Sequence, residues 1–218
     1  AISDTSLRIG ETANVTFTFS EPVTGFNNAD ITVENGFISA VNSSDGGITW
    51  TATYTPNANV QDSSNIITIN NTGLTDAAGN TGSGTTSSSN YTIDTKRPTA
   101  SILMSDDALI AGETSHVTIT FSEVVSGFTT ADLTVANGSV SGLSSSDGGM
   151  TWGATFTPTN NIESSANIIT LDNAGVADAV GNIGSGSTSS LNYSIDTKRP
   201  TASITLSDTS LSIGETAN

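Results

Sequence analysis

The chain of 218 residues contains no cysteine, only five basic residues, one histidine and few aromatic side chains, which make up 6%. The missing cysteines exclude disulfides, thiolate nucleophiles and cysteine-ligated metals. The scarcity of lysine and arginine, against 21 acidic residues and a net charge of −16, argues against nucleic acid or anionic membranes as partners, since both require basic patches. Apolar runs last only a few residues, far short of the roughly 20 that cross a bilayer, so no membrane insertion is expected.

What the chain does contain is a long internal repeat. Residues 4–100 align without a gap to residues 106–202, and 60 of the 97 aligned positions are identical. A period of about a hundred residues exceeds the roughly 20–50 residues of solenoid repeats, so it indicates an array of whole domains, each with its own core. We expect repeat 1 at 1–97, repeat 2 at 98–199 and the first-strand stub of a third repeat at 200–218, in a slice of a longer array.

Each repeat is expected to be all-β. Apolar residues alternate with threonine in stretches such as 15–19 and 48–54, and helical periodicity is absent. One face of each strand therefore packs and the other meets water, which is typical of antiparallel sheets stacked as a sandwich. Turn signals separate about seven strands, a number that predicts tandem immunoglobulin-like antiparallel β-sandwiches. The expected strands lie near residues 2–9, 12–20, 30–34, 37–43, 47–55, 65–70 and 90–95.

The acidic residues occupy repeated positions. Sixteen of the 21 fall at seven places that every available copy retains. If successive strands alternate in direction, the loops near Glu21–Asp30, Asp45 and Asp76–Asn80 share the upper end of repeat 1. The last strand then ends at the lower end with Asp94. A short linker, stiffened by its proline, brings Asp94 to the upper end of repeat 2.

Carboxylates from separate loops, with amide oxygens nearby, are the hard oxygen ligands that calcium prefers, and calcium takes six to eight of them. Without a cation, several carboxylates at one junction would repel one another. The sequence therefore predicts Ca²⁺ between adjacent repeats, and it places no histidine or cysteine for zinc. The candidate ligands at the junction, with their counterparts in the other copies, are Asp94, Glu123, Asp132, Asp178, Asn182, Glu21, Asp30, Asp76, Asn80 and Asp196.

Turn chemistry is the alternative for several acids. Asp45 before two glycines, and Asp76 before Ala-Ala-Gly-Asn, are also what tight turns favour for local hydrogen bonds. Asp4 and Asp106 are expected to begin or kink the first strand, with a place near the junction as the alternative. Glu11 lies at the lower end, where it is either structural or close to the following junction.

Five motifs recur in the same order and spacing in both repeats, and together they cover the chain. They are Gly10-Glu11-Thr12, Phe19-Ser20-Glu21, Ser44-Asp45-Gly-Gly-Ile-Thr-Trp50, Asp76-Ala-Ala-Gly-Asn80 and Asn90-Tyr-Thr-Ile-Asp94-Thr. This set resembles the bacterial Ig-like repeats of giant secreted adhesins, the biofilm-associated surface proteins exported by type I secretion. The resemblance implies an extracellular stalk on the bacterial cell surface, often stiffened by calcium at its junctions, that projects a terminal adhesive domain.

In that family the acidic linker and loop positions would correspond to Asp94, Glu123, Asp178 and Asn182. One departure is the Lys-Arg pair after Asp94 and again after Asp196. Two bases beside a calcium site would lower its affinity unless they point away, and pairing with acids such as Glu11 is the alternative.

The function expected from these features is mechanical. The chain is interpreted as a structural extender that supports cell adhesion and biofilm formation, a monomeric rod whose partners are adjacent repeats of the same chain and whose receptor is bound elsewhere in the full-length protein. Catalysis is not expected, because the only histidine, His116, replaces Asn14 at an outward strand position.

The alternative is an adhesive module that recognises a carbohydrate or host surface protein through its upper loops. Phe26 and Phe128 are its best exposed candidates, or else they plug the open end of the sandwich. The tail at 202–218 is expected either to be disordered or to pair with a sheet edge of a neighbouring molecule.

Overall fold

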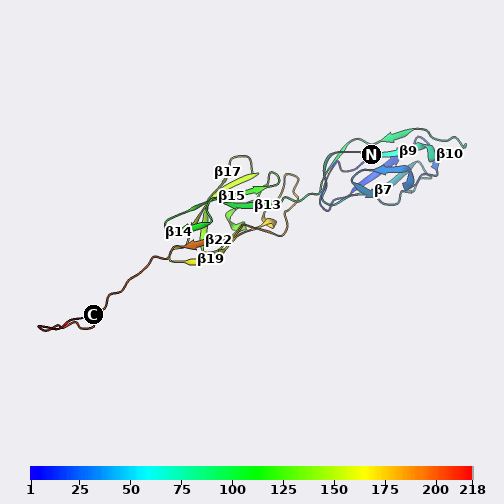
Figure 1. The fold of residues 1–218 in the computed structure, drawn as a ribbon. Coiled ribbons are helices and arrows are strands. Elements are labelled where there is room, and N and C mark those ends of the chain that lie inside the picture. The colour runs from blue at the N-terminus through cyan, green and yellow to red at the C-terminus, as the bar shows by residue number, and fades with distance from the viewer. Residues whose placement is uncertain (218) are drawn as a thin grey trace.

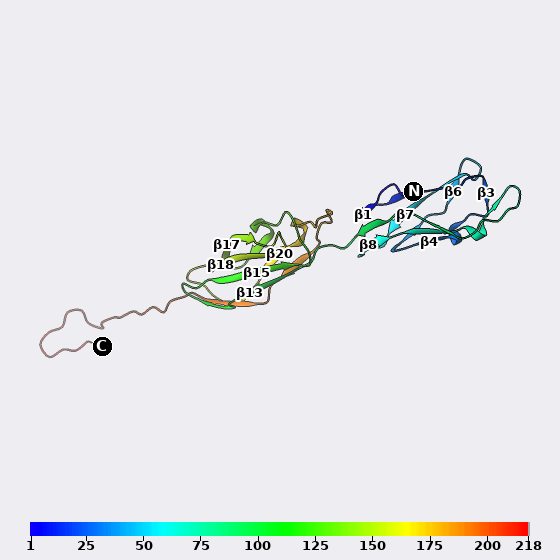
Figure 2. The same ribbon diagram turned by 90° about the horizontal axis from the view of Figure 1, so that it is seen from above.

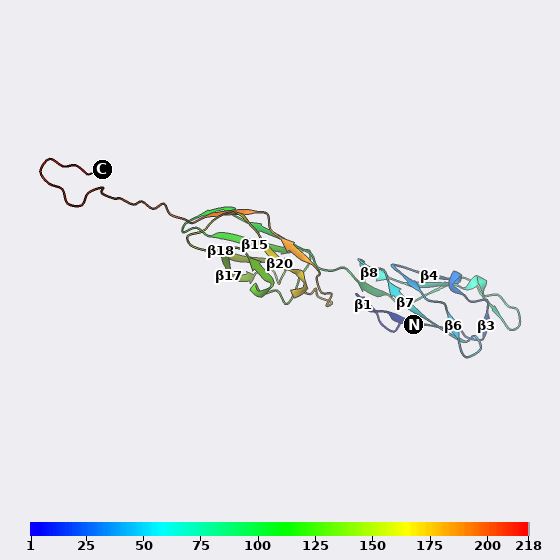
Figure 3. The ribbon, with the colours of Figure 1, turned by 90° about the horizontal axis from the view of Figure 1, so that it is seen from below.

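The computed structural model describes residues 1–217, and Asn218, the last residue of the expected stub 200–218, lies outside the described residues. Two β-sandwiches follow one another along an elongated molecule, and the C-terminal segment leaves repeat 2 on the side away from repeat 1 (Figure 1). Views from above and below show the same end-to-end arrangement (Figure 2 and Figure 3). Among the described residues, no helix has the length and apolar character needed to cross a membrane.

Repeat 1 consists of short strands and single-turn 3-10 helices. One sheet has the order β2-β7-β5, with β6 also pairing with β7, and the opposite layer contains β1-β12-β8 and β11-β9-β4. The short pair β10-β3 closes one end. The elements are β1 Ser6–Arg8, β2 Ala13–Thr18, β3 Val23–Thr24, η1 Asn28–Asp30, β4 Ile31–Val33, β5 Gly36–Ile38, β6 Asn42–Ser43, β7 Thr49–Pro56, β8 Gln61–Asn65, β9 Ile67–Asn70, η2 Asn71–Gly73, β10 Thr75–Asp76, β11 Thr85–Ser87 and β12 Tyr91–Asp94.

Repeat 2 has the same plan, with two longer strands, β15 and β17, in its first sheet. Its first sheet has the order β13-β15-β18-β17, and the opposite layer contains β14-β22-β19 and β16-β20-β21. The elements are β13 Ala100–Met104, β14 Ala108–Ile110, β15 Ser115–Phe121, η3 Thr130–Asp132, β16 Leu133–Val135, β17 Gly138–Ser145, β18 Thr151–Pro158, β19 Glu163–Asn167, β20 Ile169–Asp172, η4 Asn173–Gly175, β21 Ser187–Ser189 and β22 Tyr193–Asp196. The all-β, tandem-sandwich expectation is confirmed.

The expected single first strand is wrong, because it divides between the two layers. In repeat 2, β13 pairs antiparallel with β15, whereas β14 pairs parallel with β22. The chain changes layer at Asp106, whose backbone N–H donates to the Ser115 hydroxyl and whose carboxylate accepts from the Ala108 N–H. Asp106 thus kinks the strand, as the sequence predicts, and the sandwich is antiparallel except at this strand.

Two further strands differ from the expectation. The expected strand at 37–43 is split into the two short strands β5 and β6. The expected strand at 65–70 is preceded by an additional strand, β8, which pairs with β12 and has an irregularity in its register. The serine- and threonine-rich β11 was not expected, because it lacks the apolar alternation that marks the other strands. The grouping of loops is confirmed, since the Val23 N–H donates to the Gly47 carbonyl and Val23 pairs with Asp76.

Each repeat has its own apolar core between its two layers. At the upper end, Phe26 packs edge-on against Phe17, Phe19 and Trp50, with ring centroids 5.2 to 5.4 Å apart. Phe26 and its counterpart Phe128 are only 4% and 5% exposed. They therefore plug the open end of each sandwich, and the alternative of exposed binding residues is wrong for both.

Candidate metal centre

The linker between the repeats is tied to the lower end of repeat 1. Asp94 ends β12, and the next residue, Thr95, is buried. The Thr95 hydroxyl donates to the Asn57 carbonyl at 2.7 Å and accepts from the Val60 N–H at 3.0 Å. These bonds fix the direction in which the chain leaves repeat 1 and hold Asp94 against the next repeat.

Three carboxylates from separate segments meet at this junction. Asp94 comes from the end of β12, Glu123 follows β15, and Asp178 lies in the turn that follows η4. One oxygen from each lies within 4.8 Å of the others. Asp178 is buried at 4% exposure, whereas Asp94 and Glu123 are half-buried. The sequence predicted all three as ligands at one junction, and the structure brings them together.

The buried carboxylate of Asp178 is fixed by its own turn. One of its oxygens accepts from the backbone N–H groups of Val180 and Asn182, at 3.0 and 2.8 Å, and the other accepts from the Asn182 side chain at 2.7 Å. Asp76 makes the equivalent bonds with Ala78 and Asn80 in repeat 1. The turn-chemistry alternative therefore holds for this position, and in repeat 2 the turn also faces another domain.

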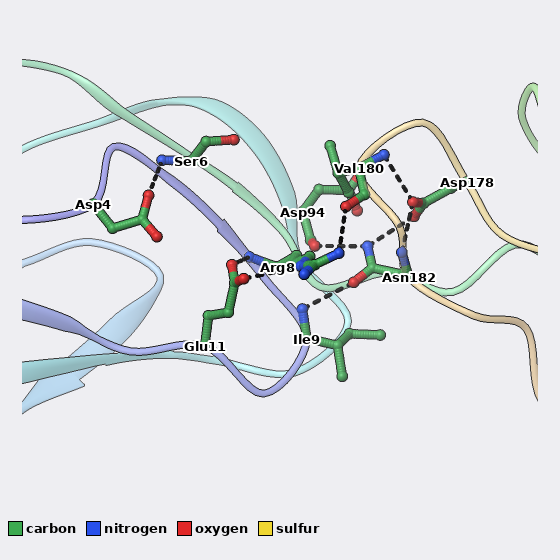
Figure 4. A network of polar contacts seen from close by, with 9 residues as sticks. All are labelled: Asp4, Ser6, Arg8, Ile9, Glu11, Asp94, Asp178, Val180 and Asn182. Carbon is green, nitrogen blue, oxygen red and sulfur yellow. Dashed lines mark hydrogen bonds and ion pairs between the residues drawn. The ribbon is translucent and has the colours of Figure 1, made fainter.

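Direct hydrogen bonds join the two repeats around the carboxylates (Figure 4). The Asn182 side chain donates to the Asp94 carbonyl at 2.8 Å and accepts from the Ile9 N–H at 2.9 Å. The Arg8 guanidinium donates to the Val180 carbonyl at 3.1 Å, and Arg97 donates to the Ile183 carbonyl. Repeat 1 and the linker thus hold the 178–183 turn from several sides.

The electrostatics of the junction are unfavourable without a counter-charge. Burial raises the pKa of the Glu123 carboxyl, and the neighbouring charges of Asp178 and Asp94 raise it further. Lys96 acts in the opposite direction on the same pKa. Partial burial and two like charges together disfavour the ionised form of Glu123.

The basic residues do not pair as the sequence suggested. Glu11 accepts from the Arg8 side chain at 2.9 Å, rather than from the Lys-Arg pair of the linker. Because Arg8 also donates to the Val180 carbonyl of repeat 2, it belongs to the junction. The sequence analysis did not predict this role. The available signal was its position, because Arg8 is the one basic residue outside the Lys-Arg pairs.

The remaining candidate ligands lie elsewhere. Asp30 and Asp132 accept from the backbone N–H groups of Asn27 and Thr129, as capping boxes of η1 and η3. Among the described residues, neither carboxylate belongs to the group of three. Glu21, Asp76 and Asn80 share the upper end of repeat 1, at a cavity of about 340 Å³. Asp196 ends β22 and accepts from the Lys198 N–H.

Asp45 and its counterpart Asp147 organise turns. The Asp45 carboxylate accepts from the backbone N–H groups of Ile48 and Thr49 and from the Ser43 hydroxyl. These bonds, led by that from Thr49, lower the pKa of Asp45 to about 2. The equivalent bond from Thr151 holds the pKa of Asp147 below its usual range.

These turn acids predict a loss of stability in acid. Because the folded pKa of Asp45 lies below its ordinary value of 3.8, its contribution is present above about pH 4 and is lost as the pH falls toward 2. Urea unfolding at neutral pH and near pH 2.5 should show this loss, and Asp45→Asn should reduce it. Glu163→Gln, which removes an exposed charge of β19, is the control. An equal acid loss in Asp45→Asn and the parent would contradict the assignment.

The comparisons with known proteins identify the domains. A family model described as a bacterial Ig-like domain matches residues 1–93 and again residues 94–195. The chain belongs to this family. A search of curated proteins gave no match.

Two solved structures are similar to this pair of bacterial Ig-like domains. One is described as the Escherichia coli adhesin FdeC, with 12% identity over 89% of this chain and 62% of that one, at a TM-score of 0.36. The other is the Yersinia pseudotuberculosis adhesin InvE, with 14% identity over 86% of this chain and 57% of that one, at a TM-score of 0.34. The chain thus spans less than two thirds of the length of either structure.

Proposed function

We propose that this pair of bacterial Ig-like domains is an extender segment of a bacterial cell-surface adhesin, and that Ca²⁺ stiffens the joint between its repeats. The segment would space a terminal adhesive domain from the cell and so support adhesion and biofilm formation. The observation that carries the proposal is the meeting of Asp94, Glu123 and Asp178 within 4.8 Å at the junction of two domains that follow end to end.

The donor set fits calcium. Each of the three carboxylates brings one hard oxygen to the junction. Oxygens are the ligand class that calcium takes at coordination numbers of six to eight, whereas magnesium is seldom enclosed by protein ligands alone. The carboxylates come from repeat 1 and repeat 2, so a cation held by them would link the domains. When bound, the cation would neutralise the repulsion that raises the pKa of Glu123. Asn182 would keep Asp178 and the Asp94 carbonyl in position.

Thermal unfolding tests the calcium proposal. The chain is scanned in excess EDTA, in millimolar calcium and in millimolar magnesium. At calcium about 100-fold above its dissociation constant, the folded state gains about 2.7 kcal/mol, which raises the Tm of a domain of this size by about 10 °C or more. Magnesium is expected to give a smaller rise. Identical curves in the three solutions would overturn calcium binding at this joint.

Glu123→Gln should have opposite effects with and without calcium. In EDTA the substitution removes a carboxylate that its neighbours repel, so Tm should rise, and in calcium it removes a ligand, so the calcium-dependent shift should shrink. Glu21→Gln is the matched control, because Glu21 holds the same position in repeat 1 and lies outside the group of three. Equal effects of the two substitutions would contradict a site at the junction.

The pH dependence has a defined sign in EDTA. Because the pKa of Glu123 is raised in the folded protein, protonation of this group favours the folded state. Its contribution to stability therefore increases as the pH falls through the folded pKa toward the ordinary value of 4.5. Glu123→Gln should remove this gain.

A further inference from the structure

Charged residues avoid one of the two layers in each repeat. The first sheet contains β2, β5, β6 and β7 in repeat 1 and β13, β15, β17 and β18 in repeat 2. All 21 acidic and five basic residues belong to the part of the chain that the structure describes, and none of them lies in these strands. The strands of the opposite layers contain Arg8, Asp62, Asp94, Glu163, Asp172 and Asp196.

The outer side of each first sheet carries hydroxyl groups instead. In β2 and β15 every second residue is buried, and the residues between them are exposed or half-buried. On this side Thr16 lies opposite Thr51 in repeat 1, and Thr120 lies opposite Thr151 in repeat 2. Directly opposite residues share one face of a sheet. We call this outer side of the first sheet the threonine face of a repeat.

Each threonine face also exposes a large apolar side chain. Phe37 of β5 lies opposite Thr55 and is 60% exposed, and Leu103 of β13 lies opposite Thr118 and is 64% exposed. Removal of such side chains from water is favourable. Because the strands of the face carry no charged residue, a second surface can cover the face without burying an unpaired charge.

The net charge of −16 restricts how two copies of the chain can meet. Copies with a large charge of the same sign repel each other, and this repulsion keeps proteins monomeric. The repulsion is smallest where both copies present a surface without charge. A hydroxyl group both donates and accepts hydrogen bonds, so a threonine face can pair with an identical face about a two-fold axis.

We propose that two copies of this chain associate side by side, with the threonine face of a repeat in one copy against the threonine face of a repeat in the other. A strongly charged partner would gain no ion pair from the strands of this face, whereas a second copy meets a surface of its own kind. The contact uses strands within each repeat and none of the three junction carboxylates, so it does not depend on bound calcium.

The size of the face indicates a weak contact. The eight-residue strand β18 is about 27 Å long and its four-stranded sheet is about 19 Å wide, so one face offers roughly 500 Å². A standard interface buries about 800 Å² on each partner. We therefore expect a monomer in dilute solution and association at high concentration. Several repeats of a longer array that engage together would bind much more tightly.

Sedimentation of the chain in EDTA, at concentrations up to about 1 mM, tests for a contact of this small size. The weight-average mass should rise with concentration. The rise should be larger in about 1 M than in about 0.01 M NaCl, because the Debye length falls from about 30 Å to about 3 Å. A constant monomer mass would overturn the proposal, and so would a rise that salt suppresses. EDTA separates this result from the calcium proposal.

A carboxylate placed in each face should abolish the association. Thr53→Glu combined with Thr155→Glu adds one charge at an exposed central position of β7 and of β18. Thr32→Glu combined with Thr134→Glu is the matched control, because it adds the same charge at exposed positions of β4 and β16 in the opposite layer. The control should associate almost as the parent does. Equal behaviour of the two double variants would overturn the proposal.

Amide chemical shifts locate the contact without any substitution. Between dilute and concentrated protein, the shifts should change along β7 and β18 and stay constant along β9 and β20 of the opposite layer. Changes confined to the opposite layer would overturn the proposal. A chain that stays monomeric, but shows the β7 and β18 changes when a soluble neutral glucan is added, would assign the face to a polysaccharide and overturn self-association.

Discussion

Replacement of Phe156 by alanine is expected to destabilise repeat 2 strongly while the stability of repeat 1 changes little. Phe156 is fully buried, and its ring packs edge-on against Tyr193 with centroids 5.1 Å apart. Removal of a buried phenylalanine costs about 3–5 kcal/mol, a large part of the roughly 5–15 kcal/mol that stabilises a domain. Because each repeat has a separate core, the loss should be confined to one of them.

Two tryptophans make this result measurable. Trp50 reports on repeat 1 and Trp152 on repeat 2, so Trp→Phe variants isolate the fluorescence of either domain. In Phe156→Ala the Trp152 transition should move to much lower urea, and the Trp50 transition should move little. Phe37→Ala is the control, because Phe37 is 60% exposed on β5. A joint shift of both signals would show that the repeats unfold as one unit.

Asn182→Ala is expected to loosen the joint between the repeats. The side chain satisfies the Asp94 carbonyl, the Ile9 N–H and the Asp178 carboxylate. A buried polar group left without a partner costs about 1–3 kcal/mol. The substitution should therefore destabilise repeat 2 and broaden the distribution of angles between the domains, which small-angle scattering detects as a reduced maximum dimension.

The matched substitution Asn80→Ala separates the joint from the turn. Asn80 donates to Asp76 as Asn182 does to Asp178, so both variants lose the same bond within the turn. Only Asn182→Ala also loses the hydrogen bonds to the preceding repeat. The excess effect of Asn182→Ala over Asn80→Ala thus measures the joint. Equal effects would mean that Asn182 acts only within its own turn.

The sequence predicted the architecture because strand alternation is a local pattern that can be read from the residues alone. Alternation of threonine with apolar residues identifies strands with one buried face, and stretches such as 48–54 occur as β7. The meeting of Asp94, Glu123 and Asp178 could also be predicted, since strand direction and a stiff linker determine which loops meet. These inferences need no knowledge of side-chain conformation.

The features that the sequence did not predict depend on which of several possible partners a side chain or strand pairs with. Asp132 caps η3 through the Thr129 N–H, a local bond that no strand count reveals. The first strand divides between the two layers in both repeats, so which layer each half joins depends on pairing with distant strands such as β15 and β22. Arg8 reaches Val180, 172 residues away, so its partner depends on how the domains are oriented.

The Arg8 contact makes successive joints unequal. Ile110 stands in repeat 2 where Arg8 stands in repeat 1, and Ser212 stands there in the third copy. Neither side chain provides a guanidinium that can donate to a carbonyl of the following domain. Wherever another repeat follows repeat 2, that joint lacks the arginine contact that is present between repeat 1 and repeat 2. Bending under load would concentrate at such a joint, so the residue at this one position of the repeat would set where an array of these domains flexes.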